Sequence, residues 1–262
     1  MLLDVNKVAA TLMAEHGDRV QYRPFAAACG IASVSDAYAV QREHVRQQMQ
    51  ARNTSAVGYK IGITTKRMQA MCGIDSPVAG VVLADRVHAS GTRLRTSAYG
   101  RMGLEFEIAV RLKRDLSPEG GVPPLVHVAA AVDAVAPAIE IIDDRNADYG
   151  SLDALSLIAD NAWNAGIVLG DFVEAWPDLP SIEGIASVDG KAIDRGFGRD
   201  VLGHPFHAVA WLARHLAEQG GGLRTGDIVM TGSVVTTKFP DRPMAYRFDV
   251  NGLGLVDVAI ES

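Results

Sequence analysis

Cysteine, net positive charge and long apolar runs are scarce in this 262-residue chain, and each scarcity excludes a class of protein. The two cysteines, Cys29 and Cys72, lie far apart and form no Cys-x-x-Cys pair, so we expect reduced thiols rather than a disulfide or a zinc site. With 25 basic and 31 acidic residues, the net charge is −6. This balance argues against nucleic acid or an anionic membrane as a partner, because no basic patch is available to bind phosphates.

Targeting signals and nucleotide-binding motifs are absent as well. No apolar stretch reaches the roughly 20 residues that would span a bilayer, and no basic segment precedes an apolar core at the N-terminus. The sequence therefore predicts a soluble, cytoplasmic protein. It lacks Gly-x-Gly-x-x-Gly, a Walker-type lysine loop and a Gly-x-Ser-x-Gly elbow, which disfavours nucleotide-phosphate binding and serine-hydrolase chemistry.

The residues that are present suit a globular protein with a large core and many turns. Hydrophobic residues make up 48% of the chain, beside 26 glycines and 11 prolines. Apolar positions recur at helical spacing over residues 4–16 and 33–52, which predicts an N-terminal helical segment over residues 1–55. From there the pattern changes to short strands and turns, and we assign residues 56–262 to one catalytic domain.

Three local patterns within residues 56–262 make specific predictions. Small residues over 127–136 favour a helix, and Asp189-Gly190 between two apolar runs predicts a hairpin turn. His204-Pro205 opens the clearest helix. His204 and His207 have a spacing that metal ligands use, but zinc needs three protein ligands, and capping or packing is the commoner role at a helix start.

Carboxylates stand out in two strand-like segments. Over residues 104–110, apolar residues alternate with Glu105 and Glu107, which predicts a strand with both carboxylates on one face. The second segment places Glu140 in an apolar run that is typical of a strand buried on both sides. A buried carboxylate must be paired, protonated or metal-bound. Oxygen ligands without nearby histidine or cysteine suit Mg²⁺ or Mn²⁺.

Lys60 is the one charged residue of a strand-like segment over residues 57–63, with a glycine two positions away on either side. Glycine in a strand often marks the close approach of a ligand or another backbone, so Lys60 is a candidate for a cleft. Alternatives remain open for both features. Lys60 could lie exposed on an edge strand, and the glutamates could form a solvated face paired with Arg111 and Lys113.

Several motifs, in order along the chain, resemble the fumarylacetoacetate hydrolase superfamily, and within it the 2-keto-4-pentenoate hydratase / 4-oxalocrotonate decarboxylase branch. They are Gly58-Tyr59-Lys60-Ile61-Gly62, Leu104-Glu105-Phe106-Glu107-Ile108-Ala109, Ala138-Ile139-Glu140-Ile141-Ile142-Asp143-Asp144-Arg145, Ala159-Asp160-Asn161-Ala162, Leu202-Gly203-His204-Pro205 with Trp211-Leu212-Ala213, and Gly226-Asp227-Ile228-Val229-Met230-Thr231-Gly232-Ser233.

The resemblance implies a fold and a site. The fold is α+β, with a mixed β-roll of the fumarylacetoacetate hydrolase C-terminal type behind the N-terminal helical segment. The cofactor is a divalent metal, Mg²⁺ or Mn²⁺. The implied site residues are Glu105, Glu107 and Glu140 as metal ligands, Lys60 as the catalytic residue, and Asp160, Asn161 and Ser233 as substrate-binding residues.

The resemblance also implies an activity, namely metal-dependent addition of water to a short 2-keto-4-enoate of the 2-hydroxypenta-2,4-dienoate type, in aromatic meta-cleavage catabolism. The alternatives are a 4-oxalocrotonate-type decarboxylase or C–C bond hydrolase of the same superfamily, and a non-catalytic assembly subunit. The implied partners are the small 2-keto acid substrate, further copies in a homo-oligomer, and a related decarboxylase or hydratase subunit.

One position departs from the branch. Its hydratases carry an acidic residue in a Pro-Asp-aromatic-Gly stretch, whereas this sequence has Pro77-Val78-Ala79-Gly80, with Asp75 shifted by three residues. The missing carboxylate weakens the hydratase prediction and favours the decarboxylase alternative.

Overall fold

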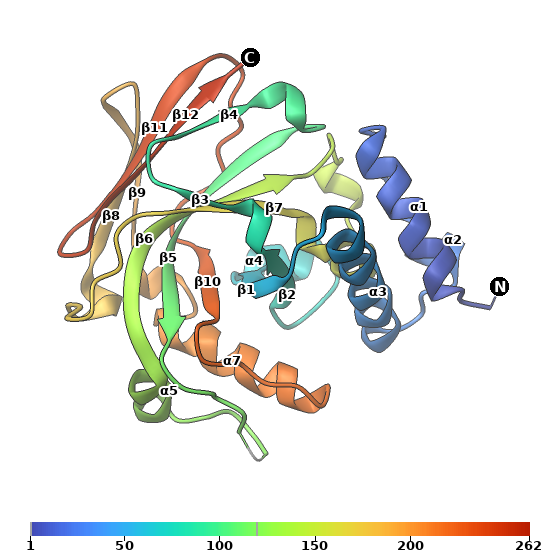
Figure 1. Ribbon diagram of the computed structural model, residues 1–262, viewed down its shortest axis with the longest axis horizontal. Helices are drawn as coiled ribbons and strands as arrows, with labels where there is room; N and C mark the ends of the chain where they lie inside the picture. Colours follow the sequence, from blue (N-terminus) through green and yellow to red (C-terminus); the bar gives the residue numbers. More distant parts are fainter. Residues whose placement is uncertain (1, 119) are drawn as a thin grey trace.

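Two mixed β-sheets, with helices packed around them, form the structure, a computed structural model that describes residues 2–118 and 120–262 (Figure 1). The larger sheet, sheet A, contains in spatial order β2 (Val78–Leu83), β1 (Ala56–Gly62), β10 (Ile228–Ser233), β5 (Met102–Leu112), β6 (Val132–Asp143), β7 (Asn164–Leu169) and β3 (Val87–Ala89). Sheet B contains β4 (Thr92–Arg95), β12 (Gly254–Glu261), β11 (Met244–Val250), β8 (Glu183–Val188) and β9 (Lys191–Phe197).

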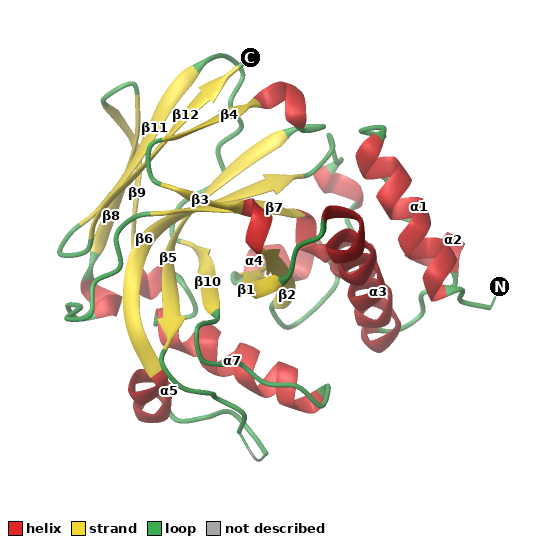
Figure 2. Ribbon diagram, in the orientation of Figure 1, coloured by secondary structure: helices red, strands yellow, loops and turns green. Residues whose placement is uncertain are grey.

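The helices lie outside the sheets (Figure 2). They are α1 (Val5–Gly17), α2 (Ala26–Cys29), α3 (Val34–Arg52), α4 (Lys66–Met71), α5 (Leu125–Ala131), α6 (Ala154–Ala159) and α7 (Pro205–Glu218). The first and third pack together on the side of the molecule away from sheet B, and α3 also packs on α6. In the described ranges, no helix is both long and apolar enough to span a membrane.

Helix and turn signals in the sequence agree with these elements. The side chain of Ser33 accepts a hydrogen bond from the Asp36 N–H and caps α3. Pro205 is the first residue of α7, and the His204 ring caps that helix by accepting from the Phe206 N–H. The turn at Asp189-Gly190 joins β8 to β9, as predicted.

The predicted helix over residues 127–136 is wrong in its second half. The helix α5 ends at Ala131, and Val132 already begins β6. Alanine favours a helix locally, but this segment pairs with β5 from Leu112 onward and is almost entirely buried. Long-range pairing therefore overrides local propensity here.

The pair β5–β6 lies at the centre of sheet A, and the alternation along β5 decides what each face carries. On one face, Phe106 packs against Tyr246 and Phe248 of sheet B, with ring centroids 6.1 and 5.5 Å apart. Glu105 and Glu107 point to the opposite face, because successive side chains of a strand alternate. The predicted strand and its two-sided pattern are confirmed.

Two histidines meet where the N-terminal helices α1 and α3 pack together. His44 of α3 is fully buried, and its ring stacks on that of His16 from α1, with centroids 5.6 Å apart. Burial lowers the pKa of His44 from 6.5 to about 4, although the nearby Asp160 carboxylate opposes this shift. His44 is therefore neutral at pH 7, and the folded state favours its neutral form over its protonated form.

This burial predicts that the free energy of unfolding falls as the pH is lowered from 6.5 towards 4. In that window unfolded His44 binds a proton and folded His44 does not, so the unfolded state gains up to about 3 kcal/mol. His44→Gln should flatten this part of the pH dependence in denaturant unfolding measured in metal-free buffer. His127→Gln, an exposed histidine on α5, is the control. Identical pH profiles for His44→Gln and the parent chain would contradict the assignment.

Candidate active site

Three carboxylates meet on the face of sheet A opposite to Phe106. Glu105 and Glu140 lie directly across from each other in the β5–β6 register, and Glu107 follows two residues along β5. One oxygen from each of the three lies within 4.8 Å of the other two. Glu107 and Glu140 are fully buried, whereas Glu105 is partly exposed. Glu105 is therefore the member of the cluster that solvent reaches.

Lys60 reaches the same cluster from β1. Its Nζ lies 3.3 Å from Glu140 Oε1, and the Lys60 side chain is only 4% exposed. The sequence left two alternatives, an exposed edge lysine and a solvated face of glutamates. Neither fits, because Lys60 is buried and two of the three glutamates are not solvated. Arg111 instead forms an ion pair with Asp133, 2.7 Å between its Nη2 and the Asp133 Oδ2.

The charges of this cluster do not balance. Three carboxylates face one ammonium group, so two negative charges remain when all four groups are ionised. Burial, together with mutual repulsion, raises the pKa of Glu107 well above its ordinary range, and burial raises that of Glu140 despite Lys60. Burial alone would lower the pKa of Lys60, but attraction to the three glutamates outweighs it and raises that pKa.

Two carboxylate oxygens lack hydrogen bonds altogether. Glu107 Oε1 and Glu140 Oε2 are buried and have no partner within the part of the chain that the structure describes. Buried acceptors are almost always satisfied, and an exception calls for a missing ligand. Two unpaired oxygens and two uncompensated charges fit a divalent cation that prefers oxygen ligands.

Three of the other four oxygens accept hydrogen bonds, from β10, from β7 and from the segment that follows β10. Thr237 Oγ1 donates to Glu105 Oε1 at 2.8 Å, the Gly232 N–H to Glu107 Oε2 at 2.7 Å, and Asn164 Nδ2 to Glu140 Oε1 at 2.9 Å. These bonds orient the carboxylates, as partners behind metal ligands commonly do. The sequence prediction missed Thr237 and Asn164, although a lone asparagine opening an apolar strand was a usable signal.

Two of the predicted substrate-binding residues lie next to this cluster. Ser233 is opposite Glu107 in the β10–β5 register, and its Oγ accepts from the Phe106 N–H at 3.0 Å. The side chain of Asn161 pairs with the backbone of Val81 instead of pointing freely into space. The roles of both residues in substrate binding remain predictions.

Asp160 is placed differently. Its Oδ1 lies 2.6 Å from His16 Nε2 and its Oδ2 2.7 Å from Arg145 Nη2. Its carboxylate is fully buried and faces the N-terminal helices, so the structure does not bring it together with the three glutamates. Attraction to His16 and Arg145 outweighs the effect of burial and lowers the pKa of Asp160 to about 2.

Glycines leave room for the lysine. A β-carbon at Gly80 would lie 2.6 Å from the backbone oxygen of Asn161 and 3.1 Å from Cγ of Lys60. No larger residue fits between them without a shift. The glycine signal around Lys60 therefore reflects close packing of the lysine stem against neighbouring backbone.

Val78 borders the same space as the lysine ammonium group. A β-carbon at Gly62 would lie 3.1 Å from Lys60 Nζ and 3.6 Å from Val78 Cγ2. Val78 is fully buried, whereas the nearby Asp75 is exposed. The side chain at position 78, where a carboxylate is expected from the resemblance, thus presents an apolar surface beside Lys60.

Proteins of similar sequence and structure show the family of this chain. The family model for the fumarylacetoacetate (FAA) hydrolase C-terminal region matches residues 33–251. A 4-oxalocrotonate decarboxylase from a Pseudomonas species is 32% identical over 85% of both chains. A 2-keto-4-pentenoate hydratase from Paraburkholderia phymatum is 31% identical, covering 96% of this chain and 95% of the relative.

Among solved structures, 4-oxalocrotonate decarboxylase from Pseudomonas putida G7, complexed with magnesium and adipate, superposes with a TM-score of 0.90 at 28% identity. The match covers 98% of this chain and 97% of that one. The predicted fold, with mixed sheets and helices of this family's type, is confirmed. The chain belongs to the fumarylacetoacetate hydrolase family.

Proposed function

We propose that this protein is a divalent-metal-dependent hydratase that adds water to a short 2-keto-4-enoate of the 2-hydroxypenta-2,4-dienoate type. The observation that carries the proposal is the buried cluster of Glu105, Glu107 and Glu140 beside Lys60. Relatives named 2-keto-4-pentenoate hydratase, about a third identical over nearly the whole chain, support the reaction class.

The three glutamates would hold the metal, with Mg²⁺ or Mn²⁺ as the preferred ion. Their oxygens meet the chemical demand of such ions, and Glu107 and Glu140 each retain an unpaired oxygen among the residues that the structure describes. When bound, the cation supplies Lewis-acid chemistry by stabilising negative charge on the 2-oxygen of the keto acid. Thr237, Gly232 and Asn164 orient the carboxylates for this task.

Lys60 supplies the second positive charge and a movable proton. Because its pKa is raised by the surrounding glutamates, it is protonated at neutral pH. At 3.3 Å from Glu140, its ammonium group would lie beside a 2-keto acid bound at the glutamates, where it could stabilise enolate charge or donate a proton. The burial of Lys60 excludes bulk water, which strengthens both effects.

The reaction balances as two proton transfers and one addition. The enol proton of 2-hydroxypenta-2,4-dienoate leaves as C5 gains a proton, which gives the conjugated 2-keto acid. Water then adds its hydroxyl group to C4 and a proton to C3, and the product is a 4-hydroxy-2-keto acid. We assign the exchange of these protons to Lys60.

Decarboxylation is the second candidate, and Val78 is the observation that favours it. Water addition profits from a base that removes a proton from water, and the side chain next to Lys60 is apolar instead. Loss of CO₂ from a 4-oxalocrotonate-type substrate needs a place for the released electrons but no activated water. The relative named 4-oxalocrotonate decarboxylase and the superposing structure agree with this candidate.

Assays on two substrates separate the candidates. We expect Mg²⁺-dependent loss of the ultraviolet absorption of 2-hydroxypenta-2,4-dienoate, with one 4-hydroxy-2-keto acid formed and no CO₂. CO₂ release from 4-oxalocrotonate, with 2-hydroxypenta-2,4-dienoate unchanged, would transfer the assignment to the decarboxylase. Inactivity on both in the presence of bound metal would contradict both.

Glu107→Gln should abolish metal-dependent turnover while the fold is kept. The amide has the shape of the carboxylate and cannot supply its charge, so we expect a loss of more than about 100-fold in activity and weaker Mg²⁺ binding. Circular dichroism checks the fold, and Glu218→Gln, with a side chain 62% exposed on α7, is the control. Turnover at the parent rate would remove Glu107 from the ligand set.

Lys60→Met should lower kcat without weakening metal binding. Methionine keeps the apolar stem but removes the charge and the proton, so a loss of about 10²- to 10⁴-fold is expected. Metal affinity should stay equal or rise, because a cation next to the bound metal has been removed. The control is Lys191→Met, an exposed lysine on β9. An unchanged kcat would exclude Lys60 from the mechanism.

A further inference from the structure

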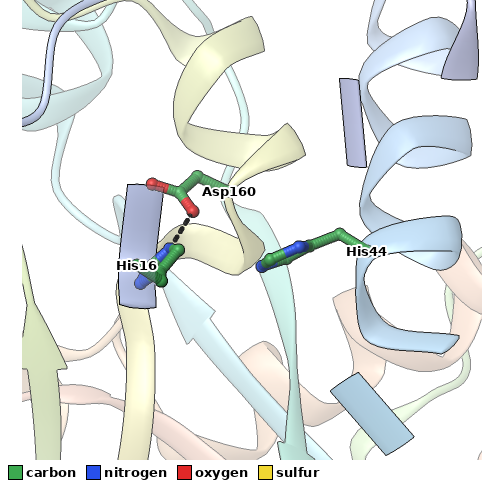
Figure 3. Close-up of side chains that lie close together, drawn as sticks. All are labelled: His16, His44 and Asp160. Carbon is green, nitrogen blue, oxygen red and sulfur yellow. Dashed lines mark hydrogen bonds and ion pairs between the residues drawn. The ribbon is translucent and has the colours of Figure 1, made fainter. Parts of the chain in front are cut away.

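A second group of metal-ligand side chains lies between α1, α3 and the end of α6, apart from the three glutamates. His16, His44 and Asp160 each place one ligand atom within 4.8 Å of the other two. Figure 3 shows the ring of His44 extending from its helix towards the bonded pair of His16 and Asp160. The three side chains come from segments far apart in the sequence.

We infer that His16, His44 and Asp160 form a second metal site, which takes a transition-metal ion of the zinc class. Two imidazoles and one carboxylate are a ligand set that such ions use, in contrast to the all-oxygen set that suits Mg²⁺. The two sites therefore differ in the metal that they select. The second site does not depend on the proposed hydratase activity.

The observed spacing needs little adjustment to hold the ion. Ligand atoms of a four-coordinate zinc ion, with bonds of about 2.0–2.2 Å, lie roughly 3.3 Å apart. His16 Nε2 and Asp160 Oδ1 lie 2.6 Å apart, so they must separate by roughly 0.7 Å. His16 is on the last turn of α1 and its side chain is 28% exposed, which leaves it free to move by that amount.

A plain hydrogen-bonded network would leave His44 unexplained. The ring is fully buried, its Nδ1 has no hydrogen-bond partner in the described ranges, and its Nε2 contacts the side-chain amide of Gln48 at 2.6 Å. A histidine buried merely for packing costs stability when one ring nitrogen stays unsatisfied. A neutral imidazole beside an ionised carboxylate is the state that a metal requires.

Arg145 does not compete with the ion for the same atom. It binds Asp160 through Oδ2 at 2.7 Å, which leaves Oδ1 directed at His16. A hydrogen bond to the second oxygen of a ligating carboxylate fixes its orientation, as partners behind metal ligands commonly do. Glu15, paired with the same arginine, offsets part of its charge.

A cavity supplies the fourth position and a route for the ion. It has a volume of about 280 Å³, and His16, Gln48 and Asn161 are among its lining residues. A partly polar space of this size has room for water molecules. A water molecule from the cavity would complete four ligands. Binding would join α1 and α3 to Asp160, at the start of the segment that carries Asn161 and Asn164.

Zinc and cobalt binding test the inference in a chain that lacks the glutamate site. In a Glu105→Gln, Glu107→Gln background, we expect one Zn²⁺ per chain by calorimetry. Co²⁺ should give the strong visible absorption of a four-coordinate site with nitrogen ligands. His44→Gln or His16→Gln in that background should weaken binding by at least about 100-fold, and His127→Gln should leave it unchanged.

Separate controls check the folding of each variant and the two sites. Circular dichroism verifies each variant, and Zn²⁺ should raise Tm in the background chain but not after His44→Gln. If the background chain binds no Zn²⁺, or if His44→Gln and His16→Gln bind it as tightly as the background, the inference is wrong. Absence of hydratase activity in the parent chain, together with Zn²⁺ binding in the background chain, would count against the proposed function alone.

Discussion

Two fully buried carboxylates, on Glu107 and Glu140, face a single buried ammonium group on Lys60. Removing one such ion from water costs on the order of several kcal/mol, and attraction repays this only where geometry and hydrogen bonds are good. Here they are incomplete, since an oxygen of each carboxylate stays unpaired among the described residues. Without a ligand, such a cluster lowers the stability of the fold. A bound cation would supply the missing charge and the missing partners of the two oxygens, which is why this imbalance is typical of a ligand-binding site.

The architecture of sheet A follows from this constraint. The carboxylates come from the neighbouring strands β5 and β6, the lysine from β1, and β10 lies between β1 and β5. In the register of the sheet, Lys60 of β1 pairs with Met230 of β10, and Met230 pairs with Ala109 of β5. Lys60 is therefore two strands away from the strand that carries Glu105 and Glu107. Gly232 at its end donates to Glu107. Each central strand therefore contributes either a charge or the donor that orients it.

Local patterns in the sequence predicted the individual residues of this site but not how they are arranged in space. Alternation along residues 104–110 predicted the strand and the face of Glu105 and Glu107, because side-chain direction in a strand is a local property. That Glu140 lies opposite Glu105, and that Lys60 lies two strands away, depends on long-range register. Only the family resemblance predicted those neighbours. Long-range pairing also explains the helix that was wrongly predicted before β6, because pairing with β5 makes Val132 the first residue of a strand.

The N-terminal helices show what pattern analysis leaves out. Their periodicity predicts amphipathic helices and nothing more, yet α1 and α3 each contribute a histidine to a group that includes Asp160. The resemblance placed Asp160 among substrate-binding residues, but Arg145 and His16 occupy both of its oxygens. Which partner a buried aspartate finds depends on helices more than 100 positions away in the sequence, and no local signal encodes that choice.

The apolar contact of Val78 with the space beside Lys60 bears on reaction choice for a physical reason. Hydration and decarboxylation both need a positive group near the 2-oxygen, and Lys60 together with a cation held by the glutamates would serve both equally. They differ in the group that must be handled next, an activated water or a departing carboxylate. An apolar wall lowers the tendency to hold and deprotonate water, and it weakens the solvation of a carboxylate, which favours its loss as CO₂. If the proposed site is correct, selection between the two reactions would depend on the surface around Lys60 more than on the three glutamates.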